Sequence, residues 1–383
     1  MFQSLGRLIG LLAMTWLAAA CAAPAAPPAP APTAPAAASV PTAAAPAPTA
    51  PSRTPTSGPA APAALSPAVR VRVGTVPSTG MAPIYIALDR GYFTQLGLEV
   101  DNVEFDAVTR MMQPLAAGQL DAVAAALSAG MFNAAAREID MRIVADRGAD
   151  VAGYGETAVV VRRDLWDGGE VRALEDLRGR RVGVPGFQAG SAVTAELGHA
   201  LETRGMSLDQ LDIVDAPFSE TMAGLANRSL DAGFSIEPLI TIGVNNGTFS
   251  VLLRSSELYP DMQQGFMLYS ADFARNQTEA ARRWMVAYLR GVRDYADAFV
   301  KGQGRDEVID ILIRNTSVKD PAIYRQMTPP YINPNGRVNA AKLAEAQDWF
   351  AAHGYVPQKA DMAALIDMQF VDYALQILGE YRQ

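Results

Sequence analysis

Cysteine and histidine are almost absent from this sequence of 383 residues, which has one cysteine and two histidines. The single cysteine, Cys21, lies in an N-terminal segment outside the folded region, so a disulfide, a thiolate nucleophile and a cysteine-based metal site are excluded. His199 and His353 each lie in a helical pattern among Ala, Leu and Gly, which is typical of a packed or surface histidine. The net charge of −8 does not suit nucleic acid, whose phosphates require a basic surface. The sequence therefore predicts no metal site, no cofactor and no nucleic-acid partner.

The first twenty residues have the pattern of a secretory signal, with Arg7 near the start and an apolar run from Leu8 to Ala20 that is too short to cross a bilayer. This segment ends in LAAAC, which resembles a bacterial lipobox, although Ala18 replaces the usual leucine. We expect residues 1–20 to be removed and Cys21 to be lipidated. The exported protein is then anchored to the outer face of the cell membrane, or in the periplasm, as a lipoprotein. An ordinary signal peptide with an incidental cysteine is the alternative.

Residues 21–68 consist almost entirely of Ala, Pro, Thr and Ser and hold more than half of the 26 prolines of the chain. Such a segment has too little apolar bulk to fold and too much proline to form a helix, so we expect an extended tether. From Val69 onward the composition is ordinary, and the remaining length of about 315 residues is enough for two domains.

One phrase occurs twice in this folded region, as MMQPLAAGQLDAV at 111–123 and as TMAGLANRSLDAG at 221–233. Strand-like and helix-like segments alternate around each copy, which indicates right-handed βαβ units on a mostly parallel sheet. We therefore predict an α/β protein with two equivalent lobes. Within the phrase, Asp121 and Asp231 are interpreted as residues of a turn or of the start of a strand.

Two further strand-like segments, at 156–166 and 249–258, flank the second copy and are interpreted as the crossings between the lobes. They predict a discontinuous first lobe, formed by 69–160 and by 257–383 with the C-terminal helices, and a second lobe at 161–256. Because ligands of open parallel sheets bind at the carboxyl ends of the strands, we expect the site between the two lobes.

In their order and spacing, the segments MAPIYIALDRGYFTQLGLEVDNVEF, LEDLRGRRVGVPGFQAGSA and LDAGFSIEP resemble the NMT1/THI5-like (SsuA-like) family of ABC-transporter periplasmic substrate-binding proteins. The resemblance spans 69–380. It implies the periplasmic-binding-protein-like fold of type II, with two βαβ lobes around a central ligand cleft and a two-strand hinge. It also implies a monomeric, non-enzymatic protein that closes on a small molecule and delivers it to ABC permease and ATPase subunits. Enzymes of this fold use histidine- and cysteine-rich motifs or a cofactor-anchoring cysteine, which the folded region lacks.

The loops expected at the cleft contain hydroxyl, amide, carboxylate and aromatic groups but no lysine or arginine, and Arg110 only borders one of them. Since a sulfonate or phosphate site usually recruits a cation, this mixture favours a planar, uncharged heterocycle such as riboflavin or a thiamine-precursor pyrimidine. The alternatives are an alkanesulfonate, taurine or nitrate held by backbone N–H groups, and an extracellular sensor with the same cleft. The predicted ligand-binding residues are Ser78, Thr79, Tyr85, Asp106, Ser128, Tyr154, Phe187, Gln188, Ser191, Glu220 and Glu237.

Some of these residues also fit purely structural roles. Ser78 and Ser191 are placed to cap helices, Tyr85 lies between two isoleucines as a core residue would, and Glu237 precedes a proline as a helix N-terminal acid would. Phe187 follows a glycine in a predicted loop and fits no core position, so it is the strongest candidate together with Gln188 and Ser191.

Overall fold

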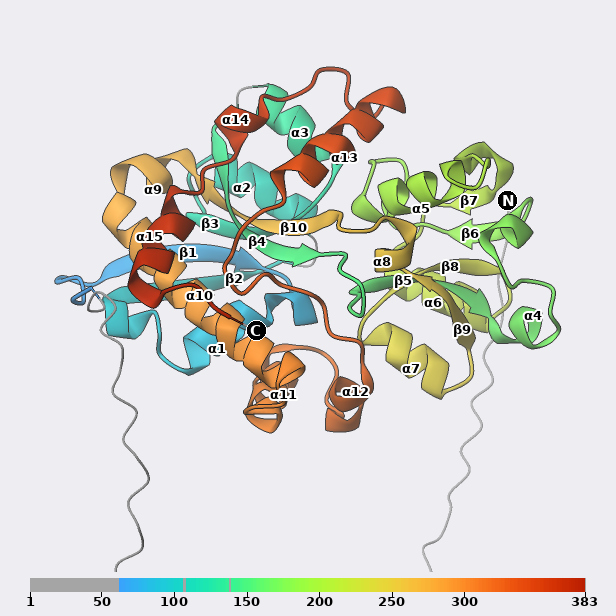
Figure 1. Ribbon diagram of the computed structural model, residues 1–383, viewed down its shortest axis with the longest axis horizontal. Helices are drawn as coiled ribbons and strands as arrows, with labels where there is room; N and C mark the ends of the chain where they lie inside the picture. Colours follow the sequence, from blue (N-terminus) through green and yellow to red (C-terminus); the bar gives the residue numbers. More distant parts are fainter. Residues whose placement is uncertain (1–61, 106–107, 138, 383) are drawn as a thin grey trace, which may run out of the picture. The chain divides into compact units, whose positions relative to one another are not determined.

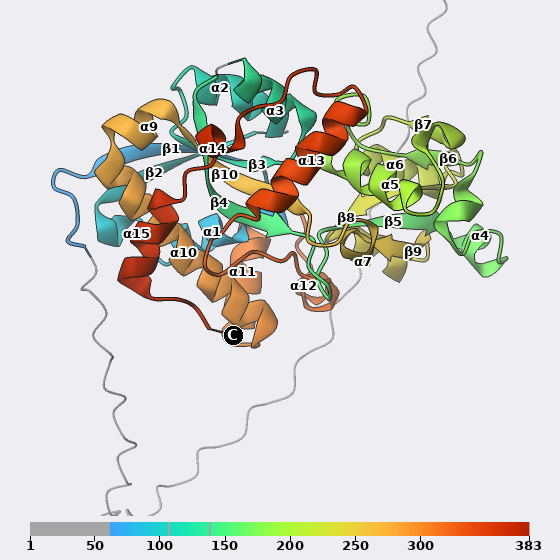
Figure 2. The same cartoon turned by 45° about the horizontal axis from the view of Figure 1, so that its top comes forward.

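The computed structural model describes residues 62–105, 108–137 and 139–382. Within this part of the chain lie two five-stranded sheets, each with helices on both faces (Figure 1, Figure 2). Both sheets belong to one compact unit, Thr56–Gln383. The predicted signal segment, the lipidation site Cys21 and the candidate Asp106 lie outside the described residues.

The first sheet has the strand order β2-β1-β3-β10-β4. Its strands are β1 (Val69–Thr75), β2 (Leu98–Glu104), β3 (Ala122–Ala126), β4 (Met141–Ala149) and β10 (Gln263–Ser270). Strand β1 pairs in parallel with β2 and β3, whereas β10 pairs antiparallel with β3 and β4. The sheet is therefore parallel except for one strand that arrives from late in the sequence.

The second sheet repeats this arrangement in the order β7-β6-β8-β5-β9. Its strands are β5 (Thr157–Arg162), β6 (Arg181–Gly183), β7 (Asp212–Val214), β8 (Ala232–Ile236) and β9 (Phe249–Arg254). Strand β6 pairs in parallel with β7 and β8, and β5 pairs antiparallel with β8 and β9. The two sheets thus have equivalent topologies, which confirms the predicted α/β fold of two lobes.

Two connections join the lobes. The chain passes from the first sheet to the second between Ala149 and Thr157, and it returns between Arg254 and Gln263. Strand β10, which follows the return, was not predicted from the sequence.

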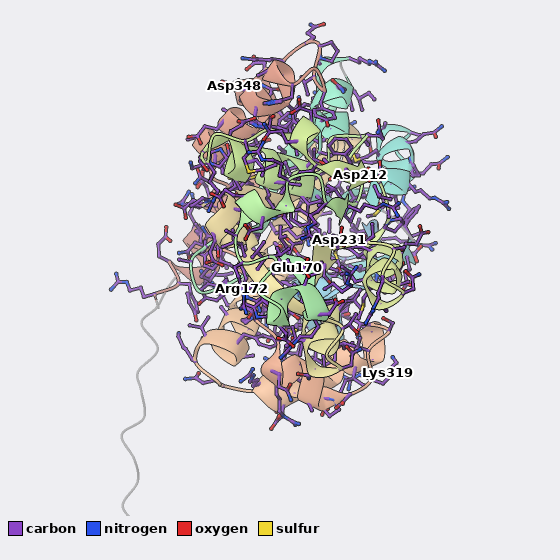
Figure 3. All side chains as sticks on the ribbon, turned by 90° about the vertical axis from the view of Figure 1, so that its right-hand side faces the viewer. Glu170, Arg172, Asp212, Asp231, Lys319 and Asp348 are labelled. Carbon is purple, nitrogen blue, oxygen red and sulfur yellow. The ribbon has the colours of Figure 1, made fainter. Side chains whose placement is uncertain are left out.

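The repeated aspartates have equivalent contacts in the two lobes. Asp121 Oδ2 accepts a hydrogen bond from the backbone N of Arg72 at 2.7 Å, and Asp231 Oδ2 accepts one from the backbone N of Arg181 at 3.2 Å. The backbone N of each aspartate donates to the carbonyl of the same arginine. Asp231 lies near Asp212 in the end view of the second lobe (Figure 3). Both aspartates therefore join the strand that they precede, β3 or β8, to its parallel neighbour, β1 or β6, in agreement with their interpretation as residues of the start of a strand.

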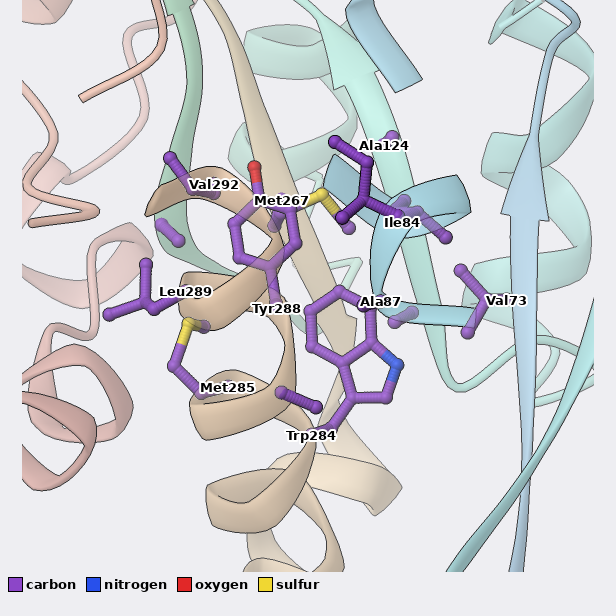
Figure 4. Close-up of a cluster of buried hydrophobic side chains, with 14 of the residues drawn as sticks. Val73, Ile84, Ala87, Ala124, Met267, Trp284, Met285, Tyr288, Leu289 and Val292 are labelled. Atoms are coloured by element: carbon purple, nitrogen blue, oxygen red, sulfur yellow. The ribbon is translucent and has the colours of Figure 1, made fainter. Parts of the chain in front are cut away.

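The core of the first lobe lies between its sheet and α10. The apolar residues Trp284, Tyr288 and Val292 recur every four positions, so they share one face of this helix and are all buried. The rings of Trp284 and Tyr288 stack at 5.3 Å, and Ile84 of α1 packs in the same cluster (Figure 4).

The helices of this lobe are α1 (Ala82–Asp89), α2 (Met112–Ala116), α3 (Ala129–Ala136), α9 (Ala271–Asn276), α10 (Thr278–Val300), α11 (Arg305–Asn315), α12 (Pro321–Gln326), α13 (Ala340–Ala352), α14 (Met362–Leu365) and α15 (Gln369–Leu378), with the 3-10 turns η1 (Thr79–Met81), η2 (Thr94–Leu96) and η3 (Val108–Met111).

The second lobe contributes a helix of small residues, α5, to the contact between the lobes. Ala192 and Ala195 of α5 are buried in one apolar cluster with Trp349 and Phe350 of α13 from the first lobe.

No helix in the described ranges is long and apolar enough to cross a membrane. The helices of this lobe are α4 (Arg163–Asp167), α5 (Ala192–Glu202), α6 (Phe218–Ala226), α7 (Leu239–Asn245) and α8 (Ser255–Leu258), with the 3-10 turns η4 (Leu174–Leu177) and η5 (Leu208–Gln210).

Candidate ligand cleft

Four loops that follow the carboxyl ends of parallel strands meet between the lobes, two from each lobe. Thr79, after β1, is buried and donates from Oγ1 to the backbone O of Glu237, after β8, at 3.4 Å. Ser128, after β3, forms an isolated antiparallel bridge with Ser191, after β6. Four of the predicted site residues therefore lie where the two lobes touch.

The three predicted serines differ in what their side chains contact. Ser128 caps α3, because its Oγ accepts from the backbone N of Met131 at 3.4 Å. Ser191 precedes α5 but donates from Oγ to the carbonyl of Pro185 at 2.6 Å and makes no cap hydrogen bond. Ser78 precedes η1 and also makes no cap hydrogen bond. The structure thus gives a capping role to Ser128 rather than to Ser78 or Ser191.

The loop before Ser191 is fixed by one carboxylate. Asp215 accepts from the backbone N of Gly186 and of Gln188, both at 2.9 Å, while the Gln188 side chain is exposed. Phe187 is half-buried and lines a hollow of about 380 Å³ together with Tyr355, from the turn after α13. The other residues of this hollow are Leu208, Asp209, Leu211, Ile213 and His353. Two aromatic rings from different lobes therefore border one hollow.

Three predicted residues lie away from these contacts. Tyr85 is buried in the core, and its hydroxyl donates to the carbonyl of Val76 at 2.9 Å. Tyr154 packs edge-on against Tyr331 of the first lobe at 5.3 Å. Glu220 is exposed in the first turn of α6. The structure supports the core interpretation of Tyr85 and brings neither Tyr154 nor Glu220 to the meeting loops.

Glu237 has the contacts of a helix N-terminal acid. Its Oε2 accepts from the backbone N of Thr241 at 3.2 Å and from Thr241 Oγ1 at 2.8 Å, so it caps α7. Its Oε1 accepts from Arg254 Nη1 at 3.3 Å. This buried carboxylate is thus occupied by the protein itself, and it neutralises the guanidinium at the end of β9.

Charged side chains near the first connection between the lobes form a floor beneath the loops, and the sequence interpretation missed them. Arg147 of β4 is 6 % exposed and Glu156, just before β5, is 8 % exposed. Arg147 Nη2 lies 3.7 Å from Glu156 Oε2. In the sequence these residues lie in the run MRIVADRGADVAGYGETAVVV among three other charged residues, so no local pattern distinguishes them.

A pair of buried carboxyl groups completes this floor. Gln264 of β10 donates from Nε2 to Asp150 at 3.1 Å and also to Glu196 of α5, which accepts a second bond from Thr157 Oγ1 at 3.1 Å. Burial raises the pKa of Asp150 to about 7. Burial, and then the charge of Asp150, raise the pKa of Glu196 well above its ordinary value. Among the described residues, no cluster of three or more His, Cys, Asp or Glu side chains is arranged to hold a metal ion.

Both histidines lie at the contact between α5 and α13, where His199 is half-buried and His353 is exposed. His353 stacks on Trp349 with a centroid distance of 4.0 Å, and its Nε2 lies 2.7 Å from Glu202 Oε1. Trp349 Nε1 donates to the same carboxylate at 3.2 Å, and His199 stacks on Tyr259 at 3.9 Å. These contacts join the lobes.

Two repeated α/β lobes with a site between them define the class of periplasmic binding proteins. The alkanesulfonate-binding protein SsuA from Xanthomonas axonopodis pv. citri is similar with a TM-score of 0.63 and 18% identity, over 78% of this chain and 98% of that protein. The nitrate-binding protein NrtA from Synechocystis PCC 6803 is similar with a TM-score of 0.65 and 15% identity, over 82% and 89%. At these identities the likeness concerns the fold.

The family follows from the sequence itself. Residues 64–312 match the model of the NMT1-like family. The chain therefore belongs to this family of ABC-transporter periplasmic binding proteins, which confirms the resemblance described above. The riboflavin-binding protein RibY from Chloroflexus aurantiacus is 24% identical over 313 residues, which cover 79% of this chain and 83% of RibY. The protein is thus a substrate-binding component of an ABC import system.

Proposed function

We propose that this protein captures a small planar heteroaromatic vitamin or vitamin precursor between its lobes, either riboflavin or a thiamine-precursor pyrimidine. The charge balance at the cleft floor carries this proposal. Arg147 faces Glu156 at 3.7 Å, and Arg254 faces Glu237 at 3.3 Å. Each of these two guanidinium groups therefore has a carboxylate beside it that neutralises its charge.

This balance separates the candidate ligands. A sulfonate or nitrate is bound best by a guanidinium or ammonium group that is not already neutralised. A neutral heterocycle needs hydrogen-bond donors and acceptors around its edge and flat apolar contact on its faces. Phe187 and Tyr355 supply aromatic rings from the two lobes, and the name of the relative RibY gives riboflavin as a ligand within the family.

Delivery uses the two connections between the lobes as a hinge. A ligand that contacts both lobes stabilises the closed arrangement, and the permease and ATPase subunits recognise that arrangement. The lobe boundaries remain those predicted near residues 160 and 256. The proposal includes a monomeric protein without catalytic activity that is held at the outer face of the membrane by lipidated Cys21.

Thermal unfolding of the full-length chain in detergent tests the proposal. We expect riboflavin or an aminopyrimidine, at about 100 times its Kd, to raise the Tm by on the order of 5 °C. Phe187→Leu keeps apolar bulk but removes the aromatic face, so it should weaken binding about tenfold and leave the Tm of the unliganded protein nearly unchanged. A Tm increase with taurine, an alkanesulfonate or nitrate alone would contradict the proposal.

A further inference from the structure

Arg147 and Glu156 are neutralised as charges but retain unused hydrogen-bonding groups. Arg147 Nε donates to the carbonyl of Ala125 at 3.2 Å. The nearest approach of the ion pair, 3.7 Å between Nη2 and Oε2, is longer than a hydrogen bond. Within the described residues, Nη1 donates to no acceptor and the Glu156 carboxylate accepts no hydrogen bond. The side chain of Arg147 is 7 % exposed and that of Glu156 is 10 % exposed.

Such an arrangement is costly in a protein interior unless something else binds there. Removing a guanidinium and a carboxylate from water is unfavourable for each ion, and their attraction offsets this only when further hydrogen bonds are made. Buried polar groups in folded proteins almost always have partners. The ion pair can therefore take a donor to Glu156 and an acceptor for Arg147 from outside the described chain, either a ligand or water.

Two glycines make room for the guanidinium and direct the pair toward the cleft. A Cβ atom at Gly80, in the turn between β1 and α1, would overlap Arg147 Nη1 and lie 2.7 Å from Glu156 Oε1. A Cβ atom at Gly265 would lie 2.5 Å from Arg147 Nε and Nη2. Gly80 adjoins Thr79, which bonds to the second lobe, so the unused Nη1 and Oε1 both lie at the base of the interlobe contact.

We propose that Arg147 and Glu156 together recognise one edge of the ligand. Arg147 donates to a ring carbonyl or ring nitrogen, and Glu156 accepts from the neighbouring ring N–H or amino group. This assignment, which rests on the proposed function, specifies a heterocycle with an acceptor beside a donor, as in the imide of a flavin or the amidine of an aminopyrimidine. Nitrate and the sulfonate group itself offer acceptors alone, so they would bring a negative charge toward the Glu156 carboxylate.

Calorimetric titration of the full-length chain tests this pairing with two probes, riboflavin and riboflavin methylated at the imide nitrogen. Methylation removes the donor that Glu156 is proposed to bind. We expect methylation to weaken binding to the wild-type protein at least tenfold and Glu156→Gln to weaken binding of riboflavin about tenfold. The two changes should not add, because both act on the same hydrogen bond: methylation removes its donor, and glutamine replaces its charged acceptor by a neutral one. The aminopyrimidine and its N-methylated derivative form the parallel pair for the other ligand.

Arg147→Lys provides a second, independent variant because it keeps the charge but loses the planar fork, and it should also weaken binding at least tenfold. Glu170→Gln, at an exposed carboxylate of the second lobe (Figure 3), serves as the matched control and should bind as the wild type does. Unfolding midpoints verify that each variant folds. If Glu156→Gln does not fold, Arg147→Lys alone tests the pairing.

Three results would overturn the assignment, and they separate it from the broader proposal. Heterocycle binding that is unchanged in Glu156→Gln and Arg147→Lys would mean that buried water completes the ion pair. Additive losses from methylation and Glu156→Gln would mean that Glu156 does not contact that N–H. In both cases the proposed function stands. Binding of taurine or nitrate without any heterocycle would overturn both the assignment and the proposed function.

Discussion

Asp150→Asn is expected to stabilise the protein at alkaline pH and to leave its stability near pH 4 almost unchanged. Asp150 is 1 % exposed, beside Glu196, and burial raises its pKa from 3.8 to about 7. The Ser255 and Gln264 side chains oppose this shift, and the charge of Glu156 adds to it. The folded protein therefore binds a proton at pH values where the unfolded chain has already released it.

The sign and size of the effect follow from linkage. Below the unfolded pKa the carboxyl is protonated in both states, so burial imposes no ionic penalty. As the pH rises through about 4 to 7, the unfolded chain ionises first, so the free energy of unfolding falls, and the full penalty is present above pH 7. A difference of about three pH units corresponds to about 4 kcal/mol for Asp150, as an upper bound.

Urea unfolding followed by tryptophan fluorescence at pH 4, 6 and 8 measures this effect. We expect Asp150→Asn to unfold with a free energy about 2–4 kcal/mol higher than the wild type at pH 8, because the amide keeps an acceptor for Gln264 without a charge. Asp212→Asn is the matched control, since Asp212 is 62 % exposed and its replacement should stay within about 0.5 kcal/mol at each pH (Figure 3). Equal destabilisation of the Asp150 variant at pH 4 and pH 8 would refute the reasoning.

Two further substitutions test the contacts that position the cleft. Glu237→Gln should lower the free energy of unfolding at pH 7 by about 1–3 kcal/mol, because Arg254 loses its ionic partner and α7 its charged cap; an unchanged urea midpoint would contradict this. Gly198→Ala should cost about 1–3 kcal/mol, because the added methyl group would overlap the Trp349 indole. Its tryptophan emission should shift to longer wavelength, and wild-type emission and stability would show that α13 does not pack closely on α5.

Local patterns in the sequence were sufficient to predict the architecture. Strand and helix periodicities depend on neighbouring residues, and the repeated phrase placed Asp121 and Asp231 at equivalent positions, where the structure gives them equivalent hydrogen bonds. The strand β10 was missed, whereas β5, which is also antiparallel to its neighbours, was predicted as a strand. The first residues of β10, Gln263 and Gln264, are polar although both are buried, which weakened the strand signal.

The cleft could be predicted only at its loops. Strand ends located Thr79 and Ser128 in one lobe and Ser191 and Glu237 in the other, and these residues do meet. The floor could not be predicted, because its side chains come from strands and from a helix that are far apart in sequence. The loops contain no lysine or arginine, but the cleft still contains cations, because arginines reach it from β4 and β9.

The central claim is that the interlobe cleft binds a neutral heterocycle. The most direct test is a calorimetric titration of the full-length chain at pH 7 with riboflavin, an aminopyrimidine thiamine precursor, taurine and nitrate. We expect saturable one-to-one binding of riboflavin or of the aminopyrimidine and no heat of binding from taurine or nitrate. Saturable binding of taurine or nitrate, with none for either heterocycle, would contradict the account.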